Sequence, residues 1–355
     1  MKFDIALFLL MALRPADAAL STWQGCRSPE TLQGDREFAE GRYPEAYAAY
    51  EASFAKLEPG ISSADAQAIP CLMDRLATAL VRMGKLKDAL PWSLRAVERS
   101  RTLAANPTTA ILANNAAGLY LELGDVNAAE RWAREAMLIA TQTHRQNQPE
   151  PQLMWTTLAS IHVYRGDFAR AEPLFRSALF HIEMNYGPRH IEVGLAAGNL
   201  ADIYRSQDRH AKAIEMYRKA IAVFESLPEV ANRQMLWVRS GLMVSCAYSG
   251  RAAEAESLAG SALKIAEQTY TANDSSFAAV LHHVALVRLS QGDLASARQL
   301  CERALVILET TFGAESLRII APLQTYARIV RSAKDKHAAN RIDARVRMLM
   351  RAANP

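Results

Sequence analysis

The feature that most constrains the fold of this chain is a repeat of about 42 residues. A small residue, replaced once by methionine, recurs at intervals of 43, 40, 42, 42, 42, 42 and 42 positions. These first positions are Gly34, Ala77, Ala117, Ala159, Ala201, Met243, Ala285 and Ala327. A period of this length predicts a stack of similar supersecondary units in which each unit packs against its neighbours.

Two further small positions complete each repeat. Twelve residues after each first position stands an alanine: Ala46, Ala89, Ala129, Ala171, Ala213, Ala255, Ala297 and Ala339. Seven residues later come Ser53, Ala96, Ala136, Ala178, Ala220, Ala262, Ala304 and, in the last copy, Val346. Apolar residues at helical spacing, as in Ile214, Tyr217 and Ile221, predict an amphipathic helix in each half. Small residues where two helices cross let their backbones approach closely, so each repeat is predicted to be a helical hairpin.

A turn residue separates the two halves of each repeat. Six repeats carry glycine there, at Gly41, Gly84, Gly124, Gly166, Gly250 and Gly292, whereas Asp208 and Lys334 occupy the position in the other two. Glycine at this point either stops the first helix or adopts a positive φ. Since one hairpin cannot bury its own apolar face, the sequence predicts an all-α solenoid of stacked hairpins.

This pattern resembles the tetratricopeptide repeat, and its 42-residue form is similar to the repeats of kinesin light chains. The segment that carries the resemblance best is "YGPRHIEVGLAAGNLADIYRSQDRHAKAIEMYRKAIAVFE", and "TTFGAESLRIIAPLQTYARIVRS" is a weaker copy of its beginning. The resemblance implies a right-handed superhelical solenoid of about eight antiparallel helix pairs over residues 34–350. Kinesin light chains begin with a coiled coil that this chain lacks, so their motor-cargo function is not carried over.

The first residues predict an export signal. Lys2 precedes the nine-residue apolar run Ile5 to Leu13, and Ala16 and Ala18 then supply small residues for cleavage. The run is too short to span a bilayer, which needs about 20 residues, but it suits a signal peptide. A short buried N-terminal helix remains the alternative.

We therefore expect four parts: a signal peptide at 1–18, an N-terminal segment at 19–33, the repeat domain at 34–350 and a tail at 351–355. The mature protein is expected to be a periplasmic or secreted bacterial protein without a membrane anchor.

The four cysteines are interpreted with this compartment in mind. Cys26 and Cys71 flank the first repeat beside predicted loops, and export would allow them to pair. Cys246 and Cys301 fall at core-facing helical positions, where cysteine behaves as a small hydrophobic residue. Neither a C-x-x-C motif nor a Cys/His ligand spacing occurs, so neither a metal site nor a cofactor is expected.

No catalytic motif stands out in the sequence. It has no glycine-rich phosphate loop, no G-x-S-x-G and no H-E-x-x-H. The net charge of +4, without a run of five like charges, does not favour a nucleic-acid partner. His282 and His283 are adjacent, so on a helix one is expected to face the core and the other the groove. An enzyme with a site assembled from distant residues is the least favoured alternative.

The family resemblance implies a concave groove, lined by first helices, that holds an extended or helical peptide. In kinesin light chains the residue two before the first small position is often an asparagine that bonds the peptide backbone, and here Asn115 and Asn199 match it. Further candidate groove residues are Arg82, Tyr164, Asp202, Arg205, Tyr248 and Arg328. The alternative that the asparagines only cap or solvate their helices stays open.

The sequence thus predicts a non-enzymatic scaffold, in an exported compartment, that binds a protein or peptide. A cytoplasmic regulator or signalling-peptide receptor is the alternative.

Overall fold

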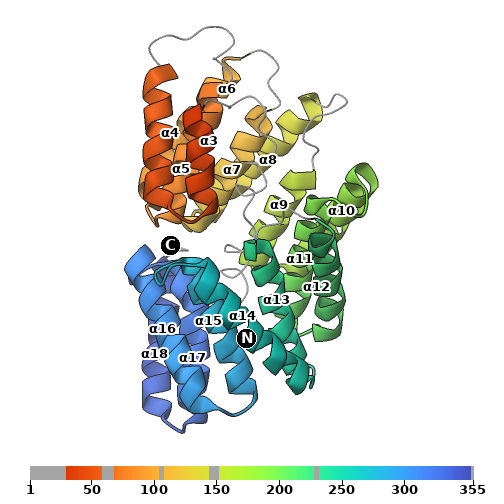
Figure 1. Cartoon of the computed structure of the whole chain (residues 1–355), viewed down its shortest axis with the longest axis vertical. Helices are drawn as coiled ribbons and strands as arrows, with labels where there is room; N and C mark the ends of the chain where they lie inside the picture. The colour runs from red at the N-terminus through yellow and green to blue at the C-terminus, as the bar shows by residue number, and fades with distance from the viewer. Residues whose placement is uncertain (1–28, 58–67, 104–107, 144–151, 228–231, 353–355) are drawn as a thin grey trace. The chain divides into compact units, whose positions relative to one another are not determined.

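The computed structural model describes residues 29–57, 68–103, 108–143, 152–227 and 232–352. These ranges contain sixteen α-helices and one short 3-10 helix, and no strand (Figure 1). No helix in these ranges is long and apolar enough to cross a bilayer. The predicted signal peptide and Cys26 lie outside the described residues.

The described chain divides into two compact units, an N-terminal unit that ends at Ile161 and a C-terminal unit that begins at His162. The N-terminal unit contains α3 (Pro29–Ala39), α4 (Tyr43–Leu57), α5 (Ala68–Arg82), α6 (Leu86–Arg101), α7 (Thr108–Glu122), α8 (Val126–Thr143) and most of α9 (Gln152–Tyr164).

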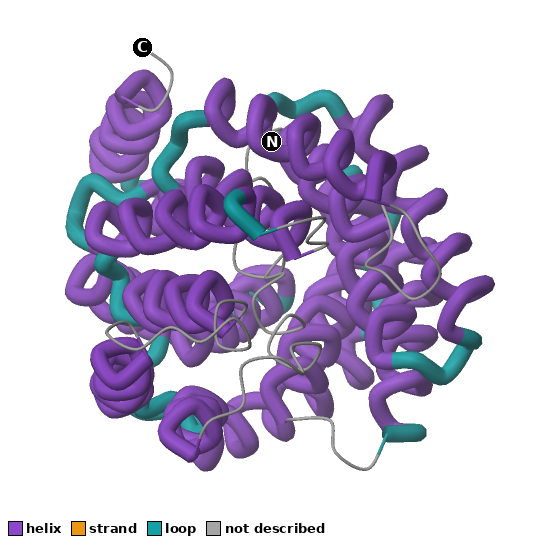
Figure 2. Tube along the Cα trace, turned by 90° about the horizontal axis from the view of Figure 1, so that it is seen from above, coloured by secondary structure: helices purple, strands orange, loops and turns teal. Residues whose placement is uncertain are grey.

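The C-terminal unit begins in the last turn of α9 and continues as pairs of helices. Helices joined by short loops make up nearly all of the described chain (Figure 2). It contains α10 (Phe168–Tyr186), α11 (Ile191–Ser206), α12 (His210–Glu225), α13 (Asn232–Tyr248), α14 (Ala252–Thr269), α15 (Ser275–Ser290), α16 (Leu294–Phe312), η3 (Leu317–Ile319), α17 (Ile320–Ser332) and α18 (Lys336–Ala352).

The small residues of the repeat lie where helices cross. All eight alanines at the second small position are completely buried, at 0 % exposure. At the first position, a Cβ added to Gly34 would lie 2.4 Å from the ring of Tyr50, so the two helices approach too closely there for a side chain. The predicted all-α fold of helix pairs is confirmed.

The turn between the two helices of a repeat is left-handed in all eight copies. Its φ lies between +57° at Asp208 and +85° at Gly124, so both non-glycine residues adopt the conformation of the six glycines. The next residue then donates its N–H to a carbonyl five residues back, as from Arg209 to Tyr204 at 2.8 Å. This bond closes the first helix as a Schellman motif and sends the chain back antiparallel.

The described cysteines behave in two ways. Cys246 and Cys301 are free, buried thiols, as predicted, and burial raises the pKa of Cys301 to about 12. Cys71, in the first turns of α5, is disulfide-bonded. Because Cys26 lies outside the described residues, the pairing of these two residues stays a prediction.

Candidate functional site

The residues predicted for a binding groove all lie on first helices of the repeats. Arg82 on α5 and Asn115 on α7 belong to the N-terminal unit. Tyr164 on α9, Asn199, Asp202 and Arg205 on α11, Tyr248 on α13 and Arg328 on α17 belong to the C-terminal unit. The structure brings Asp202 together with Arg205, and Tyr248 together with Arg328.

Asp202 is the centre of a buried hydrogen-bond network. Its carboxylate is 1 % exposed and accepts bonds from Tyr217 Oη at 2.5 Å, Trp237 Nε1 at 3.0 Å and Arg205 Nη2 at 3.1 Å. Burial, and then the Asp202 charge, raise the pKa of Tyr217 well above its usual value, so the hydroxyl stays protonated and donates. The network joins α11, α12 and α13, which makes Asp202 and Arg205 connectors between repeats.

The same arrangement occurs once in the N-terminal unit. Asp35 follows its first small position as Asp202 does, and Tyr50, fifteen residues later, donates to it at 2.7 Å. Here the counter-charge is Arg75 of the next repeat, which donates through Nε at 2.9 Å and through Nη2 at 3.2 Å. The other six repeats have neither the aspartate nor the tyrosine at these offsets. An aspartate followed by a tyrosine fifteen residues later, present in only these two repeats, is the sequence signal for this network.

Three side chains from different elements meet at a second cluster in the C-terminal unit. Arg328 donates through Nη2 to Tyr248 Oη at 2.9 Å, and its guanidinium lies 5.7 Å from the centre of the Tyr248 ring. The ring of His210, at the start of α12, stacks on Tyr248 at 5.5 Å. All three side chains are half-buried, so part of the cluster faces solvent. A guanidinium, a phenol and an imidazole together can bind a carboxylate or a peptide carbonyl.

The two predicted asparagines differ in their contacts. Asn115 donates through Nδ2 to Asp74 Oδ2 at 2.9 Å, and burial raises the pKa of that aspartate to about 7. Asn199 is 8 % exposed. Among the described residues, the amide oxygens of both asparagines, and that of Asn114, are buried without a hydrogen-bond partner.

The remaining two candidate residues are Arg82 and Tyr164. The Arg82 guanidinium is 5.7 Å from the centre of the Phe38 ring, so it covers a core side chain of the first repeat. Tyr164 is half-buried, and burial raises its pKa to about 12.

The expectation that one of His282 and His283 faces the core and the other the groove is wrong in its second part, because both side chains are buried, at 3 % and 1 % exposure. His282 Nε2 is 2.8 Å from Thr325 Oγ1 on α17. Burial, and then Arg205 and Arg328, lower the pKa of His282 to about 3, so the ring is neutral. No group of three or more potential metal-binding side chains occurs within the described ranges.

Comparison with protein families identifies the repeats. One family model of the tetratricopeptide repeat matches residues 69–142 and 152–226, and a second matches residues 277–317. Together these matches cover more than half of the chain. No curated protein sequence matches the chain.

Several solved structures have a similar fold. A Rap protein complexed with competence and sporulation factor is 13% identical, with a TM-score of 0.65, over 91% of this chain and 97% of its own. The Rap conjugation gene regulator of plasmid pLS20, in complex with the Phr* peptide, is 15% identical, with a TM-score of 0.63, over 79% and 73%.

A putative kinesin light chain from Podosopora anserina with nearly identical TPR-like repeats is 19% identical, with a TM-score of 0.41, over 55% of this chain and 92% of its own. Taken with the helix pairs and their buried small residues, the family matches show that the chain belongs to the tetratricopeptide repeat family.

Proposed function

We propose that the protein is a non-enzymatic scaffold that binds a peptide or protein segment along its first helices. In each unit separately, this proposal is carried by buried amide oxygens without a partner among the described residues. They are those of Asn114 and Asn115 on α7 of the N-terminal unit, and that of Asn199 on α11 of the C-terminal unit. A buried polar atom without a hydrogen bond costs about 1–3 kcal/mol. A peptide N–H would remove this cost once the amide turns outward to meet it, because the oxygen is closed to solvent in the unbound chain.

The C-terminal unit adds groups that suit a peptide. Arg328 and Tyr248 offer hydrogen-bond donors, and the stacked rings of Tyr248 and His210 offer an apolar surface. Asp202 and Arg205 support such a site indirectly, because their network fixes α11 against α13.

The structural neighbours support the same class of function. The two Rap structures are complexes, one with competence and sporulation factor and one with the Phr* peptide. A third neighbour, NprR in complex with its cognate peptide NprX, is 13% identical, with a TM-score of 0.57. Chains of this fold therefore bind peptides, and we extend that property to this protein.

We further propose that the scaffold works in an exported compartment. Two observations support this: the signal-like order of the first 18 residues, and the disulfide bond of Cys71. Disulfides persist in oxidising compartments and are rare in the cytosol. A cytoplasmic regulator or signalling-peptide receptor is the competing proposal, and the peptide complexes of the neighbours favour it equally.

The binding proposal is tested with a partner captured from the native source and then purified. Asn199→Ala removes an amide whose oxygen has no described partner, so we expect weaker binding by about five- to hundredfold with little change in stability. Asn115→Ala also removes a donor to Asp74, so its melting temperature is measured first. Asn340→Ala, on the exposed side of α18, is the matched control. Binding of the Asn115→Ala/Asn199→Ala double variant as tight as that of wild type would exclude the asparagines as the site.

The compartment is tested by N-terminal sequencing of the native protein. Export predicts a mature chain that begins at Ala19. A soluble native chain that retains Met1 would support the cytoplasmic receptor.

A further inference from the structure

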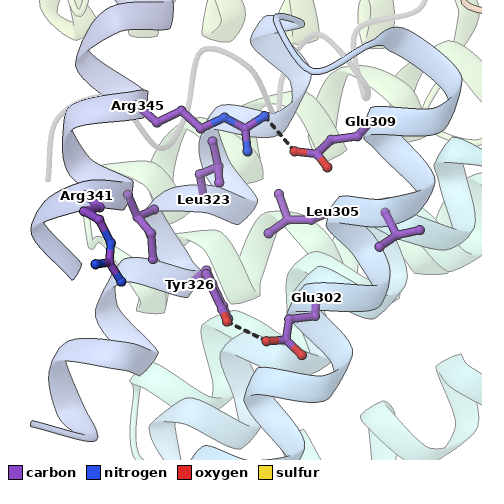
Figure 3. A pocket seen from close by; sticks show the side chains of 9 residues that line it. Glu302, Leu305, Glu309, Leu323, Tyr326, Arg341 and Arg345 are labelled. Carbon is purple, nitrogen blue, oxygen red and sulfur yellow. Dashed lines mark hydrogen bonds and ion pairs between the residues drawn. The ribbon is translucent and has the colours of Figure 1, made fainter. Parts of the chain in front are cut away.

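A groove between the last two helix pairs is lined by none of the candidate site residues described above. It lies between the second helices α16 and α18, with α17 beneath, and has a cavity volume of about 570 Å³ (Figure 3). This volume is within the range of ligand-binding pockets. The groove is lined by Glu302, Leu305, Val306, Glu309, Leu323, Tyr326, Arg341, Ile342 and Arg345.

The floor of the groove is apolar and continues onto exposed apolar side chains. Leu305 and Leu323 are buried beneath it. Val306 on α16 is 62% exposed, and Met348 on α18 is 58% exposed. Met348 stands seven residues after Arg341, so both side chains lie on the same side of α18. Large apolar side chains exposed beside an apolar groove are typical of an interaction site.

The charged side chains around the groove differ in whether they have a hydrogen-bond or ion-pair partner. Glu302 accepts bonds from Tyr326 Oη at 2.5 Å and Arg298 Nε at 2.9 Å, and Glu309 pairs with Arg345 at 2.7 Å. Both carboxylates are therefore neutralised by the protein. On the opposite wall, the guanidinium of Arg341 makes no ion pair or hydrogen bond with the residues that the structure describes, and neither does that of Arg351, three residues after Met348.

The preceding repeat lacks this combination of an exposed apolar side chain and a facing arginine. Forty-two residues before Val306 stands Lys264, and forty-two before Arg341 stands Gln299. The corresponding surface between α14 and α16 thus has a charged side chain in place of the exposed valine and a neutral one in place of the arginine.

We propose that the α16–α18 groove binds an acidic amphipathic helix of a partner protein. Aliphatic side chains of that helix pack on Leu305, Val306 and Ile342, and its carboxylates pair with Arg341 and Arg351. Positions 341 to 351 of α18 span about 15 Å, roughly three turns, which matches a helix laid along the groove. This site is separate from the first-helix faces proposed above.

The test uses the full mature chain and a phage-displayed library of random peptides of about 16 residues, roughly four helical turns. We expect selection of peptides with Asp or Glu beside aliphatic residues spaced at i, i+3 or i+4, and i+7. A synthetic peptide of selected sequence should bind the Val306→Lys/Arg341→Glu variant more weakly by about tenfold or more. The Lys264→Ala/Gln299→Ala variant, which lowers the net charge by the same one unit, should bind it as wild type does.

A second arm of the experiment tests whether acidic residues of the peptide pair with Arg341. Replacing the acidic residues of the peptide with lysine should weaken binding to wild type, and Arg341→Glu should restore part of it. The four substituted positions, Lys264, Gln299, Val306 and Arg341, are all exposed, so equal melting temperatures are expected for every variant.

Four results would overturn the proposal. These are no selected peptides, selected peptides that bind both double variants equally, Arg341-dependent binding to anionic phosphatidylglycerol vesicles without peptide selection, and a dimer in sedimentation velocity that Val306→Lys/Arg341→Glu dissociates. The first-helix proposal is independent of all four, because Asn199→Ala leaves this groove unchanged.

Discussion

The hydroxyl of Tyr217 donates a hydrogen bond to the buried carboxylate of Asp202 at 2.5 Å, and so links the second helix of one repeat to its own first helix. The equivalent bond, from Tyr50 to Asp35, is 2.7 Å long. In both places a neighbouring repeat supplies a further donor, Trp237 in one and Arg75 in the other. Each network therefore ties two adjacent repeats together through one carboxylate.

Removing the tyrosine hydroxyl tests how much this network contributes to the stability of the protein. Tyr217→Phe should destabilise the protein by about 1–3 kcal/mol, because a buried carboxylate loses one of its three donors. Asp202→Ala, which leaves Arg205 without its acidic partner, should cost about 3–5 kcal/mol. Urea unfolding measures both. Tyr326→Phe is the control, since its partner Glu302 is partly exposed, and it should cost less than either variant.

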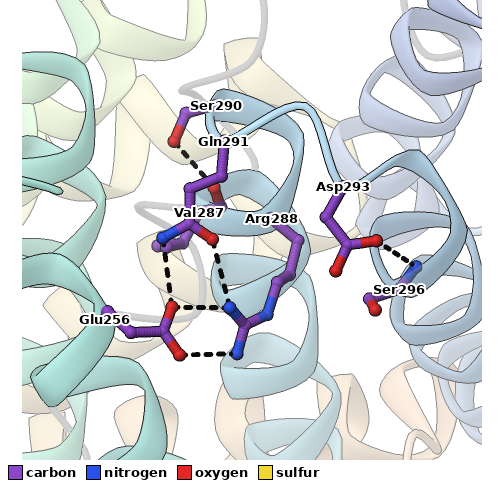
Figure 4. Close-up of polar contacts among 7 residues, drawn as sticks. All are labelled: Glu256, Val287, Arg288, Ser290, Gln291, Asp293 and Ser296. Carbon is purple, nitrogen blue, oxygen red and sulfur yellow. Dashed lines mark hydrogen bonds and ion pairs between the residues drawn. The ribbon is translucent and has the colours of Figure 1, made fainter. Parts of the chain in front are cut away.

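The left-handed turns predict which substitutions stabilise the chain. Lys334 has a φ of +68° and Asp208 a φ of +57° at positions where six other repeats carry glycine. In the equivalent turn at Gly292, the next residue, Asp293, caps α16 through the N–H of Ser296 (Figure 4). Lys334→Gly should stabilise by up to about 1 kcal/mol, because a non-glycine residue is strained there.

Asp208→Gly should give a smaller gain, since aspartate tolerates this conformation better than lysine does. Gly250→Ala should instead destabilise the protein, because φ is +80° at this position. Thermal unfolding of the three variants checks the order, and a lower melting temperature for Lys334→Gly would contradict the argument.

The helix crossings should not accept larger side chains. Ala201 and Ala213 are both 0 % exposed, so Ala201→Leu or Ala213→Leu should destabilise by about 1–3 kcal/mol through overpacking. Arg134→Ala should change little, because that side chain is 67 % exposed and makes only a surface ion pair with Glu130. Equal urea midpoints for the three variants would mean that the crossing is assigned wrongly.

Asp74 should make the folding stability of the protein depend on pH. Burial raises its pKa to about 7, against an ordinary value of 3.8. The folded protein therefore binds a proton that the unfolded chain releases, so this residue lowers stability as the pH rises from about 4 to 7. Asp74→Asn keeps an acceptor for Asn115 and removes the charge.

We expect Asp74→Asn to be more stable than wild type at pH 8, by no more than about 4 kcal/mol, since one pKa unit corresponds to about 1.4 kcal/mol. The difference should shrink towards pH 4. Urea midpoints of both proteins across this range measure it, and a difference that is independent of pH would refute the assignment.

A Cys26–Cys71 disulfide should be detectable and stabilising. On the chain-entropy model it would contribute about 4 kcal/mol. A non-reducing peptide map of the exported protein should recover the two cysteines in one cross-linked fragment. The map fails the prediction if it shows both as free thiols, and Cys71→Ser should then melt as wild type does.

The period of the sequence was sufficient to predict the helix pairs. A buried position at a helix crossing accepts no side chain larger than alanine, so the requirement at Ala213 or Ala297 is local and is visible in the sequence. The turns were predictable for the same reason, because glycine marks six of them. Asp208 and Lys334 show that the Schellman bonds impose the conformation even where glycine is missing.

The groove residues were harder to predict, because a position on a first helix does not specify its partner. Asp202 and Arg205 were predicted to line a groove, yet they bond each other, Tyr217 and Trp237. Which way such a side chain turns depends on residues 15 to 35 positions away. The bond between Tyr248 and Arg328 spans 80 positions, and no local pattern encodes it.

The eight equivalent turns also bear on how a chain like this changes over evolution. A recombination that joins codon 250 to codon 292 removes one repeat of 42 residues. The junction still has a glycine at the turn position, where φ is positive. The same event between codons 208 and 250 removes Tyr217 and Trp237 and leaves the Asp202 carboxylate buried without two of its donors. Loss of one whole repeat should therefore cost less stability between codons 250 and 292 than between codons 208 and 250, where it breaks the junction of the fifth and sixth repeats.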